Sequence, residues 1–192
     1  VLVLGQAYIA AGLMGANLKP AETLTIKIDC TGPIQTLTVD GNSFGEVRGY
    51  LSRTPIPLMR GEKVPRLEDL YGDGTLRVIK HSPNRAPSST GIVELRYGSL
   101  AKDLAYYFAH SEEIPTAFNL SVSFDDSGNM VGAGGLFLQA LPGASAAKVT
   151  DAEVIELDAT VTVHGSIFLH RPYFNCNTHH REPHNALPCL CS

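Results

Sequence analysis

Apolar and polar residues alternate with a period of two in several short stretches of the chain. In residues 23–30, Leu24, Ile26 and Ile28 alternate with threonine, lysine and aspartate, which predicts a half-buried β-strand. The same alternation between Gly- and Pro-rich boundaries predicts further strands over 34–40, 46–51, 75–81, 91–97, 118–124 and 130–141. Residues 82–90 are predicted to form a loop. The first three strands follow one another with short turns, so we expect an antiparallel meander.

Two longer stretches lack this alternation and predict helices. Residues 1–18 are rich in Ala, Leu and Gly, with no turn signal before Pro20, so we expect a buried helix that ends at this proline. Residues 98–116 predict a second helix with Ser99 as its N-cap, since one apolar stripe recurs at helical spacing, made of Leu100, Leu104, Tyr107 and Phe108. A short helix is expected over 66–72. This order of elements predicts an α+β fold with largely antiparallel sheets and packed helices.

Charge and composition narrow the classes of partner. The net charge is −4 and no basic block is longer than His179-His180-Arg181, so we expect no nucleic-acid partner and no attraction to anionic membranes. The uncharged N-terminal stretch has the length of a signal or membrane segment, but it contains Gln6 and Asn17 and no positive residue precedes it. These features favour a core helix. The chain begins with Val1, so we expect its N-terminus to continue upstream.

The character of the chain changes after Pro142-Gly143. Residues 1–143 are predicted to form the core domain, and residues 144–192 a linker or tail. A domain of this length buries a large core without disulfides, and four cysteines are too few for a disulfide framework. We therefore expect reduced thiols and a cytoplasmic protein.

Motifs of the common catalytic families are absent from the sequence. It contains no G-x-S-x-G, no Walker loop and no H-E-x-x-H. The glycine-rich residues 132–135 lie within a predicted strand, which favours a bulge or close packing over phosphate binding. Arg48 is predicted to be an exposed strand charge, with an interface ion pair as the alternative. Adjacent carboxylates are predicted to be solvated surface at Glu68-Asp69, Glu112-Glu113 and Asp125-Asp126.

The C-terminal segment gathers side chains that bind zinc. Its thiol and imidazole donors are Cys176, His179, His180, His184, Cys189 and Cys191. Their spacing is not that of a standard zinc knuckle, and by spacing alone a flexible tail with free thiols is an equal alternative. A thiol- or metal-dependent enzyme built on four of them, Cys176, His179, His180 and Cys189, is a second hypothesis. A plain protein-interaction module is a third.

Several stretches together resemble one family. In sequence order they are GEVRGYL (45–51), DLYGDGTLRVIK (69–80), GSLAKDLAYYFAHSEEIPTAF (98–118) and GGLFLQALPGA (134–144). Their order and spacing across residues 1–144 resemble the 33 kDa chaperonin family of redox-regulated heat-shock holdases. The stretch DLAYYFAHSEEIPTA is the most specific of these. The resemblance implies an α+β core domain that binds clients, meaning unfolding or oxidatively damaged proteins, without ATP and without enzymatic activity. It also implies a homodimer in the active state.

The resemblance further implies a zinc switch. In the family, a C-x-C pair and a later C-x-x-C pair bind zinc, and oxidation of the four thiols releases the metal and loosens the linker. Cys189-Leu190-Cys191-Ser192 is similar to the first pair, whereas no C-x-x-C occurs in this chain and residues 145–188 do not follow the family's pattern. We therefore expect a chain cut after the first half of the switch, which suppresses client aggregation without oxidation. Candidates for additional zinc ligands are Cys176, His179, His180 and His184.

Overall fold

The computed structural model describes residues 1–56, 66–83 and 85–140. All of them belong to the first of the two units into which the chain divides, Val1–Val161. The helices are α1 (Leu2–Gly15), the short 3₁₀ helix η1 (Leu67–Leu70) and α2 (Leu100–Ser111). The strands are β1 (Thr23–Cys30), β2 (Thr36–Asn42), β3 (Val47–Leu51), β4 (Gly74–Ser82), β5 (Arg85–Glu94), β6 (Thr116–Phe124) and β7 (Met130–Gln139). The predicted α+β class is confirmed. The predicted domain boundary at 143 and the segment 144–192 lie outside the described residues.

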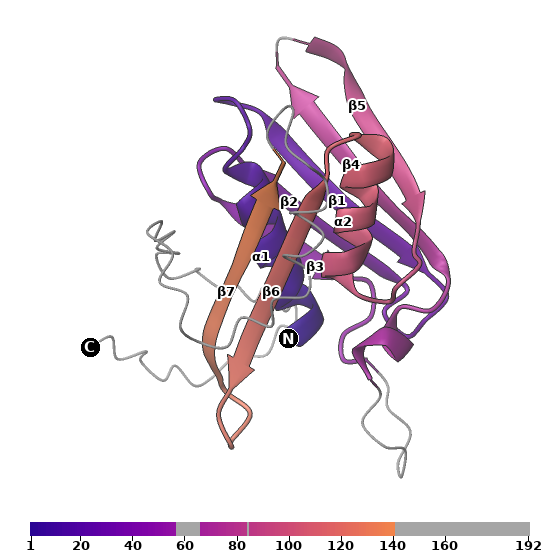
Figure 1. Ribbon diagram of the computed structural model, residues 1–192. Helices are drawn as coiled ribbons and strands as arrows, with labels where there is room; N and C mark the ends of the chain where they lie inside the picture. The colour runs from indigo at the N-terminus through magenta and orange to yellow at the C-terminus, as the bar shows by residue number, and fades with distance from the viewer. Residues whose placement is uncertain (57–65, 84, 141–192) are drawn as a thin grey trace, which may run out of the picture. The chain divides into compact units, whose positions relative to one another are not determined.

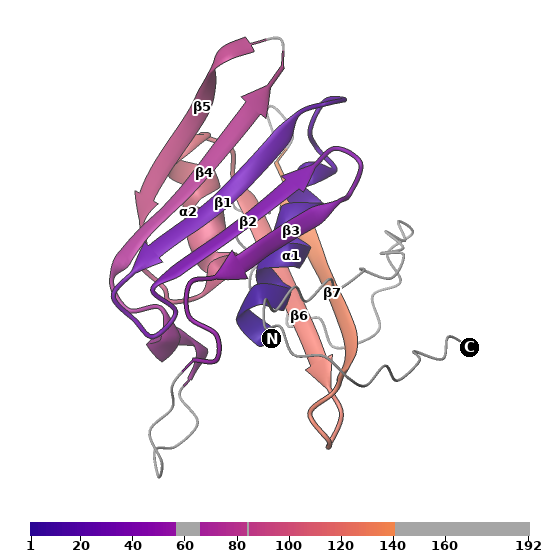
Figure 2. The same ribbon diagram turned by 180° about the vertical axis from the view of Figure 1, so that it is seen from behind.

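Five strands form one antiparallel sheet in the order β3-β2-β1-β4-β5 (Figures 1 and 2). The predicted meander is confirmed, because β1 pairs with β2 and β2 with β3. Strand β4 joins the free side of β1, where Ile26 lies opposite Val78. One face of the sheet buries the alternating apolar residues completely. The other face carries the polar positions between them, such as Thr25 and Lys27, as expected for an antiparallel sheet covered on one side.

The predicted loop over 82–90 is wrong, because β5 begins at Arg85 and its register with β4 continues to Glu94. The pairing of the two strands includes a register shift between Lys80 and Ser82. Strand β5 lies at the edge of the sheet. Edge strands tolerate serine, threonine and proline, so the polar composition that suggested a loop is compatible with an edge strand.

Helix α1 lies between the five-stranded sheet and the β6–β7 hairpin, and it packs against strands of both (Figure 1). Its fully buried residues are Val3, Ala7, Ile9, Ala10, Ala11, Met14 and Gly15, and the remaining residues between Val3 and Gly15 are half-buried. A helix covered on two faces needs apolar residues around its whole circumference. The prediction of a buried helix is confirmed. Its end is earlier than predicted, at Gly15, and therefore Pro20 does not terminate it.

Helix α2 packs on β4, β5 and β6, and the whole predicted apolar stripe is buried. Ser99 is at the N-cap position, as predicted, but its side chain makes no capping hydrogen bond. The buried carboxylate of Asp103 instead accepts hydrogen bonds from the backbone N–H groups of Arg96, Tyr97 and Ser99. One side chain therefore holds the loop between β5 and α2.

The hairpin of β6 and β7 forms a separate two-stranded sheet. Its inner face carries Phe118 and Leu120, which are buried against the helices, and Phe124, which is 39% exposed near the turn. The predicted alternation of this strand is confirmed, but the tip of the hairpin extends beyond the core. Gly135 lies within the glycine-rich part of β7, where a Cβ atom would come within 2.6 Å of Ile9 Cγ2. This contact confirms the prediction of close packing.

Neither α1 nor α2, the two α-helices in the described ranges, combines the length and the continuous apolar character that a membrane span requires.

Candidate functional site

The six predicted zinc ligands, Cys176, His179, His180, His184, Cys189 and Cys191, lie outside the described residues. Their mutual geometry is therefore still a prediction. In the part of the chain that the structure describes, no group of three His, Cys, Asp or Glu side chains is arranged to hold a metal ion.

Cys30 is the cysteine of the described core, at the end of β1. Its side chain is half-buried, and this burial raises the pKa of the thiol, although hydrogen bonds from the backbone of Gly32 and Gln35 oppose the shift. A raised pKa leaves less thiolate at neutral pH, and thiolate is the nucleophilic form. Cys30 therefore has the environment of a structural cysteine.

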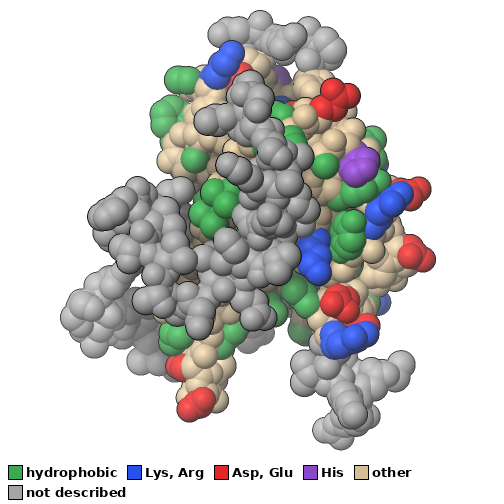
Figure 3. All heavy atoms as spheres, in the orientation of Figure 1, with side chains coloured by type: hydrophobic (Ala, Val, Ile, Leu, Met, Phe, Trp, Pro, Cys, Tyr) green, Lys and Arg blue, Asp and Glu red, His purple; other side chains and the backbone are tan. Residues whose placement is uncertain are grey.

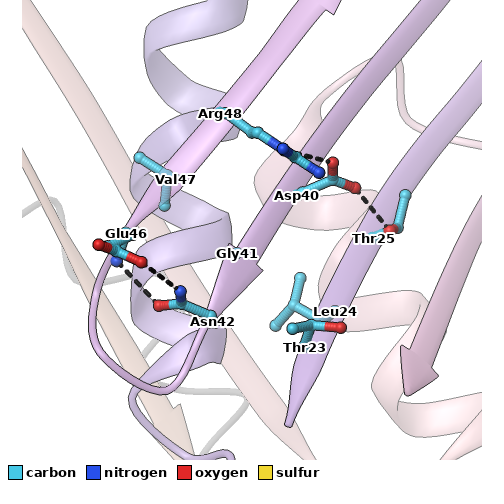
Figure 4. A pocket seen from close by; sticks show the side chains of 9 residues that line it. All are labelled: Thr23, Leu24, Thr25, Asp40, Gly41, Asn42, Glu46, Val47 and Arg48. Carbon is cyan, nitrogen blue, oxygen red and sulfur yellow. Dashed lines mark hydrogen bonds and ion pairs between the residues drawn. The ribbon is translucent and has the colours of Figure 1, made fainter. Parts of the chain in front are cut away.

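A polar depression lies where β1 begins and β2 turns into β3 (Figure 4). It has a volume of about 430 Å³, and its lining residues are Thr23, Leu24, Thr25, Asp40, Gly41, Asn42, Glu46, Val47 and Arg48. Asp40 is at its centre: it accepts a hydrogen bond from Thr25 Oγ1 at 2.6 Å, and its Oδ2 lies 3.1 Å from Arg48 Nε. These three residues are cross-strand neighbours in the register of β1, β2 and β3.

The turn beside this depression is ordered by Asn42. Its Oδ1 accepts hydrogen bonds from the backbone N–H groups of Phe44 and Glu46, and its amide donates to Glu46 Oε2 at 2.7 Å. Phe44 is held on this turn with its side chain 75% exposed. The turn is therefore a defined conformation that presents an aromatic side chain to solvent.

The depression is lined mainly by polar and charged side chains. Its charged groups are two carboxylates and one guanidinium, and no nucleophile lies beside a general base among the lining residues. Arg48 is an exposed strand charge, as predicted, and it also makes a surface ion pair. Sequence reasoning did not identify Asp40, because Thr25 and Arg48 become adjacent to it only through the strand register. It also missed Asn42, whose partners Phe44 and Glu46 lie within its own turn.

A second polar cluster joins β4 to the end of α2. Glu112 Oε1 lies 2.7 Å from Lys80 Nζ and also accepts a hydrogen bond from the Tyr107 hydroxyl. Burial raises the pKa of Glu112, but the hydrogen bonds from Lys80 and Tyr107 and the charge of Lys80 outweigh it and lower the pKa below its ordinary value. Burial and the neighbouring Glu112 carboxylate raise the pKa of Tyr107. The prediction that Glu112 is solvated surface is wrong, because it is a partly buried ion-pair partner.

Large apolar side chains reach the surface on the β6–β7 hairpin, near its turn and along β7. They are Phe124, Met130, Val131 and Leu138, and Figure 3 shows hydrophobic side chains at the surface of the hairpin just above its acidic tip. Val131 is the most exposed of them, at 66%. Exposed apolar side chains that gather on one element are typical of a surface that binds other proteins.

The described residues thus form an α+β core that exposes apolar side chains on its β6–β7 hairpin. The family model described as Hsp33 protein matches residues 2–175. The chain therefore belongs to the Hsp33 protein family, which confirms the resemblance. The match extends beyond residue 144, into the segment whose sequence alone did not follow the family's pattern.

Similar proteins agree with this assignment. The chain is 42% identical to the 33 kDa chaperonin of Desulforamulus reducens, over 73% of this chain and 48% of that protein. It is 40% identical to the 33 kDa chaperonin of Geobacillus kaustophilus, over 78% of this chain and 51% of that protein. The crystal structure of the 33 kDa chaperonin, or heat shock protein 33 homolog, from Thermotoga maritima aligns with a TM-score of 0.62 at 36% identity. That alignment covers 70% of this chain and 46% of the other. The chain thus spans about half the length of the relatives it matches.

Proposed function

We propose that this chain contains the client-binding core of an ATP-independent holdase chaperone. Its clients are unfolding or oxidatively damaged proteins, which it binds before they aggregate. The supporting observation is membership of the Hsp33 family, whose curated relatives are named 33 kDa chaperonin. The exposed apolar side chains of the β6–β7 hairpin are consistent with binding such clients. The absence of a Walker motif from the sequence is consistent with a function that does not use ATP.

The proposal also concerns the oligomeric state, the cellular location and the partners of the protein. We infer a non-enzymatic protein of the cytoplasm that forms a homodimer when active and binds neither nucleic acid nor membrane. The net charge of −4 supports the exclusion of nucleic acid. The homodimer is supported by the family resemblance alone.

We also propose that Cys189 and Cys191 belong to a redox switch. Thiolate pairs of this kind bind zinc, which keeps them deprotonated and holds a small domain folded. Peroxide oxidises thiolates first to sulfenic acids, which condense with neighbouring thiols to disulfides. This chemistry gives the two cysteines a role in regulation, separate from client binding by the core.

Aggregation of a defined client tests the holdase function. The full chain is added to thermally unfolding malate dehydrogenase, and light scattering is followed with and without prior peroxide treatment. We expect lower scattering than with the same mass of serum albumin. No suppression under either condition would contradict the holdase proposal, and suppression only after peroxide treatment would contradict the expectation that this chain acts without oxidation.

Substitution of the two terminal cysteines separates the holdase from a thiol enzyme. In the doubly substituted protein, Cys189→Ser with Cys191→Ser, we expect client suppression by the core to persist, because the exposed apolar hairpin is unchanged. Zinc content and thiol titration are measured on both proteins. Unchanged zinc content in the substituted protein would contradict a role of Cys189 and Cys191 in binding the metal, and a complete loss of client suppression would favour the thiol-enzyme alternative.

A further inference from the structure

The outer edge of β7 is unpaired within the described part of the chain. Strand β7 pairs with β6 alone, and the hairpin is not joined to the five-stranded sheet (Figures 1 and 2). A strand at the edge of a sheet presents backbone N–H and C=O groups that have no partner in the sheet. Strand β7 is ten residues long, Met130–Gln139, so this row of groups is long.

The register of the hairpin identifies which backbone groups face outward. The N–H of Ala140 donates to the carbonyl of Pro115. In an antiparallel ladder, hydrogen-bonded and non-hydrogen-bonded pairs alternate. Residues 139, 137, 135 and 133 therefore occupy non-hydrogen-bonded positions opposite β6, and their N–H and C=O groups point away from it. The outward row includes Ala133, whose side chain is exposed.

The edge of β7 lacks the features that protect other edges. None of its residues is charged and none is proline. By contrast, the edge strand β5 contains Arg85 and Pro87 and pairs with β4 through a register shift, and the edge strand β3 is only five residues long. Charges, prolines, irregular register and short length are the usual devices against unwanted strand pairing. The other edge of the hairpin, on β6, also lacks charge and proline, but Gln6 Nε2 of α1 donates there to the outward carbonyl of Leu120 at 3.2 Å. Strand β7 is therefore the described edge that has none of these protections.

Small residues leave space beside this edge. A Cβ atom added at Gly134 would meet no atom within 4 Å, and one at Gly132 would only touch Ser123 Cβ at 3.9 Å. The exposed apolar side chains of Val131 and Leu138 flank this space. An added strand would therefore contact the backbone hydrogen-bonding groups around Gly132 and Gly134 and the apolar side chains of Val131 and Leu138. No charged side chain of β7 would have to be desolvated.

We propose that the outer edge of β7 binds extended, uncharged segments of unfolded proteins by strand addition. This inference rests on the proposed holdase function and assigns it a site and a chemistry. A strand added to an edge is held by main-chain hydrogen bonds, which every polypeptide offers in its extended form. Side-chain pockets, which confer sequence specificity in other strand-adding domains, are absent beside Gly132 and Gly134. Such an edge recognises the unfolded, extended state of a client rather than its sequence.

Removal of one backbone N–H group that points outward from β7 tests whether this edge binds the extended segment. The substitution Ala133→Pro deletes this donor but leaves the hydrogen bonds between β6 and β7 intact, and Ala133→Thr is the matched control that keeps it. The probe is a fluorescein-labelled peptide of alternating threonine and valine, ten residues long by design to match the length of β7. Fluorescence anisotropy measures its Kd with the full chain. We expect a Kd about fivefold higher for Ala133→Pro, from the loss of one hydrogen bond, and an unchanged Kd for Ala133→Thr.

A second pair of variants keeps the test valid if proline perturbs the hairpin. Gly134→Lys places a charge beside the edge in open space, and Gly134→Ser is its uncharged control. We expect weaker peptide binding by the lysine variant alone, with urea unfolding midpoints equal in both. Binding of the peptide by Ala133→Pro and Gly134→Lys as tightly as by the unmodified chain would overturn the inference.

The outcome also separates this inference from the holdase function. A chain that suppresses aggregation but does not bind the peptide retains its proposed function, and the β7 edge is then excluded as the site. A chain that does neither contradicts the proposed function itself. If the variants leave peptide affinity unchanged and instead convert a dimer to a monomer in sedimentation, β7 is a contact between two copies and the inference is wrong.

Discussion

The ammonium group of Lys80 lies 2.7 Å from the carboxylate of Glu112, and this ion pair links β4 to the residue that follows α2. The same carboxylate accepts a hydrogen bond from Tyr107 on α2, and the ammonium lies over the ring of Phe108, 5.7 Å from its centroid. Both charged groups are only partly exposed. The cluster therefore fixes the end of α2 on the five-stranded sheet through charge-assisted contacts as well as through apolar packing.

The lowered pKa of Glu112 predicts that the free energy of unfolding decreases in acid. This pKa is lowered in the folded state from an ordinary value of about 4.5, so the unfolded state binds a proton more readily. The contribution of Glu112 to stability is therefore fully present above about pH 4.5 and is lost as the pH falls through the folded-state pKa. In Glu112→Gln, urea unfolding should depend less on pH in this range than in the unmodified chain. Parallel pH profiles for the two proteins would contradict this assignment.

Asp103 should be essential for holding the loop that precedes α2. It is completely buried and accepts hydrogen bonds from three backbone N–H groups, so Asp103→Ala leaves these donors without a partner. We expect the free energy of unfolding to fall by about 3 kcal/mol. Ser99→Ala is the control, because the Ser99 side chain makes no capping bond, and it should change the free energy by less than about 0.5 kcal/mol. Chemical denaturation measures both, and a larger effect at Ser99 would refute the assignment.

Two adjacent glycines of β7 should respond differently to the same substitution. A Cβ atom at Gly135 would lie 2.6 Å from Ile9 Cγ2 and 2.8 Å from the carbonyl oxygen of Asn119, whereas Gly134 has open space. We expect Gly135→Ala to lower the free energy of unfolding by about 1–3 kcal/mol through overpacking against α1. Gly134→Ala should be neutral or slightly stabilising, since it reduces the freedom of the unfolded chain. Equal unfolding midpoints for the two variants would show that α1 does not pack closely on β7.

Cys30 should be a slowly reacting thiol. Burial raises its pKa, so the fraction of thiolate at pH 8 is smaller than for an unperturbed cysteine of pKa about 8.5. Alkylation by iodoacetamide, followed by peptide mass spectrometry, should modify Cys30 more slowly in the native chain than in the urea-unfolded chain. A native rate equal to the unfolded rate would contradict the buried environment.

Local patterns predicted most of the described elements. The period of two in β1 and β6 and the apolar stripe of α2 are properties of neighbouring residues, and they lead directly to strand and helix. Residues 82–90 were the exception, because serine and threonine on an edge strand resemble a loop when the pairing partner is unknown. The zinc ligands predicted within 176–191 lie outside the described residues, so that part of the site is still a hypothesis.

The sequence by itself determined the α+β class, the buried character of α1 and, through its motifs, the family. Only the tertiary structure decided which elements meet: β4 beside β1, α1 between two sheets, and Glu112 beside Lys80, which is 32 residues away in the chain. The physical reason is the range of the interactions. Periodicity and helix propensity act between residues a few positions apart, whereas ion pairs such as Lys80–Glu112 and unpaired edges such as that of β7 depend on how distant segments pack.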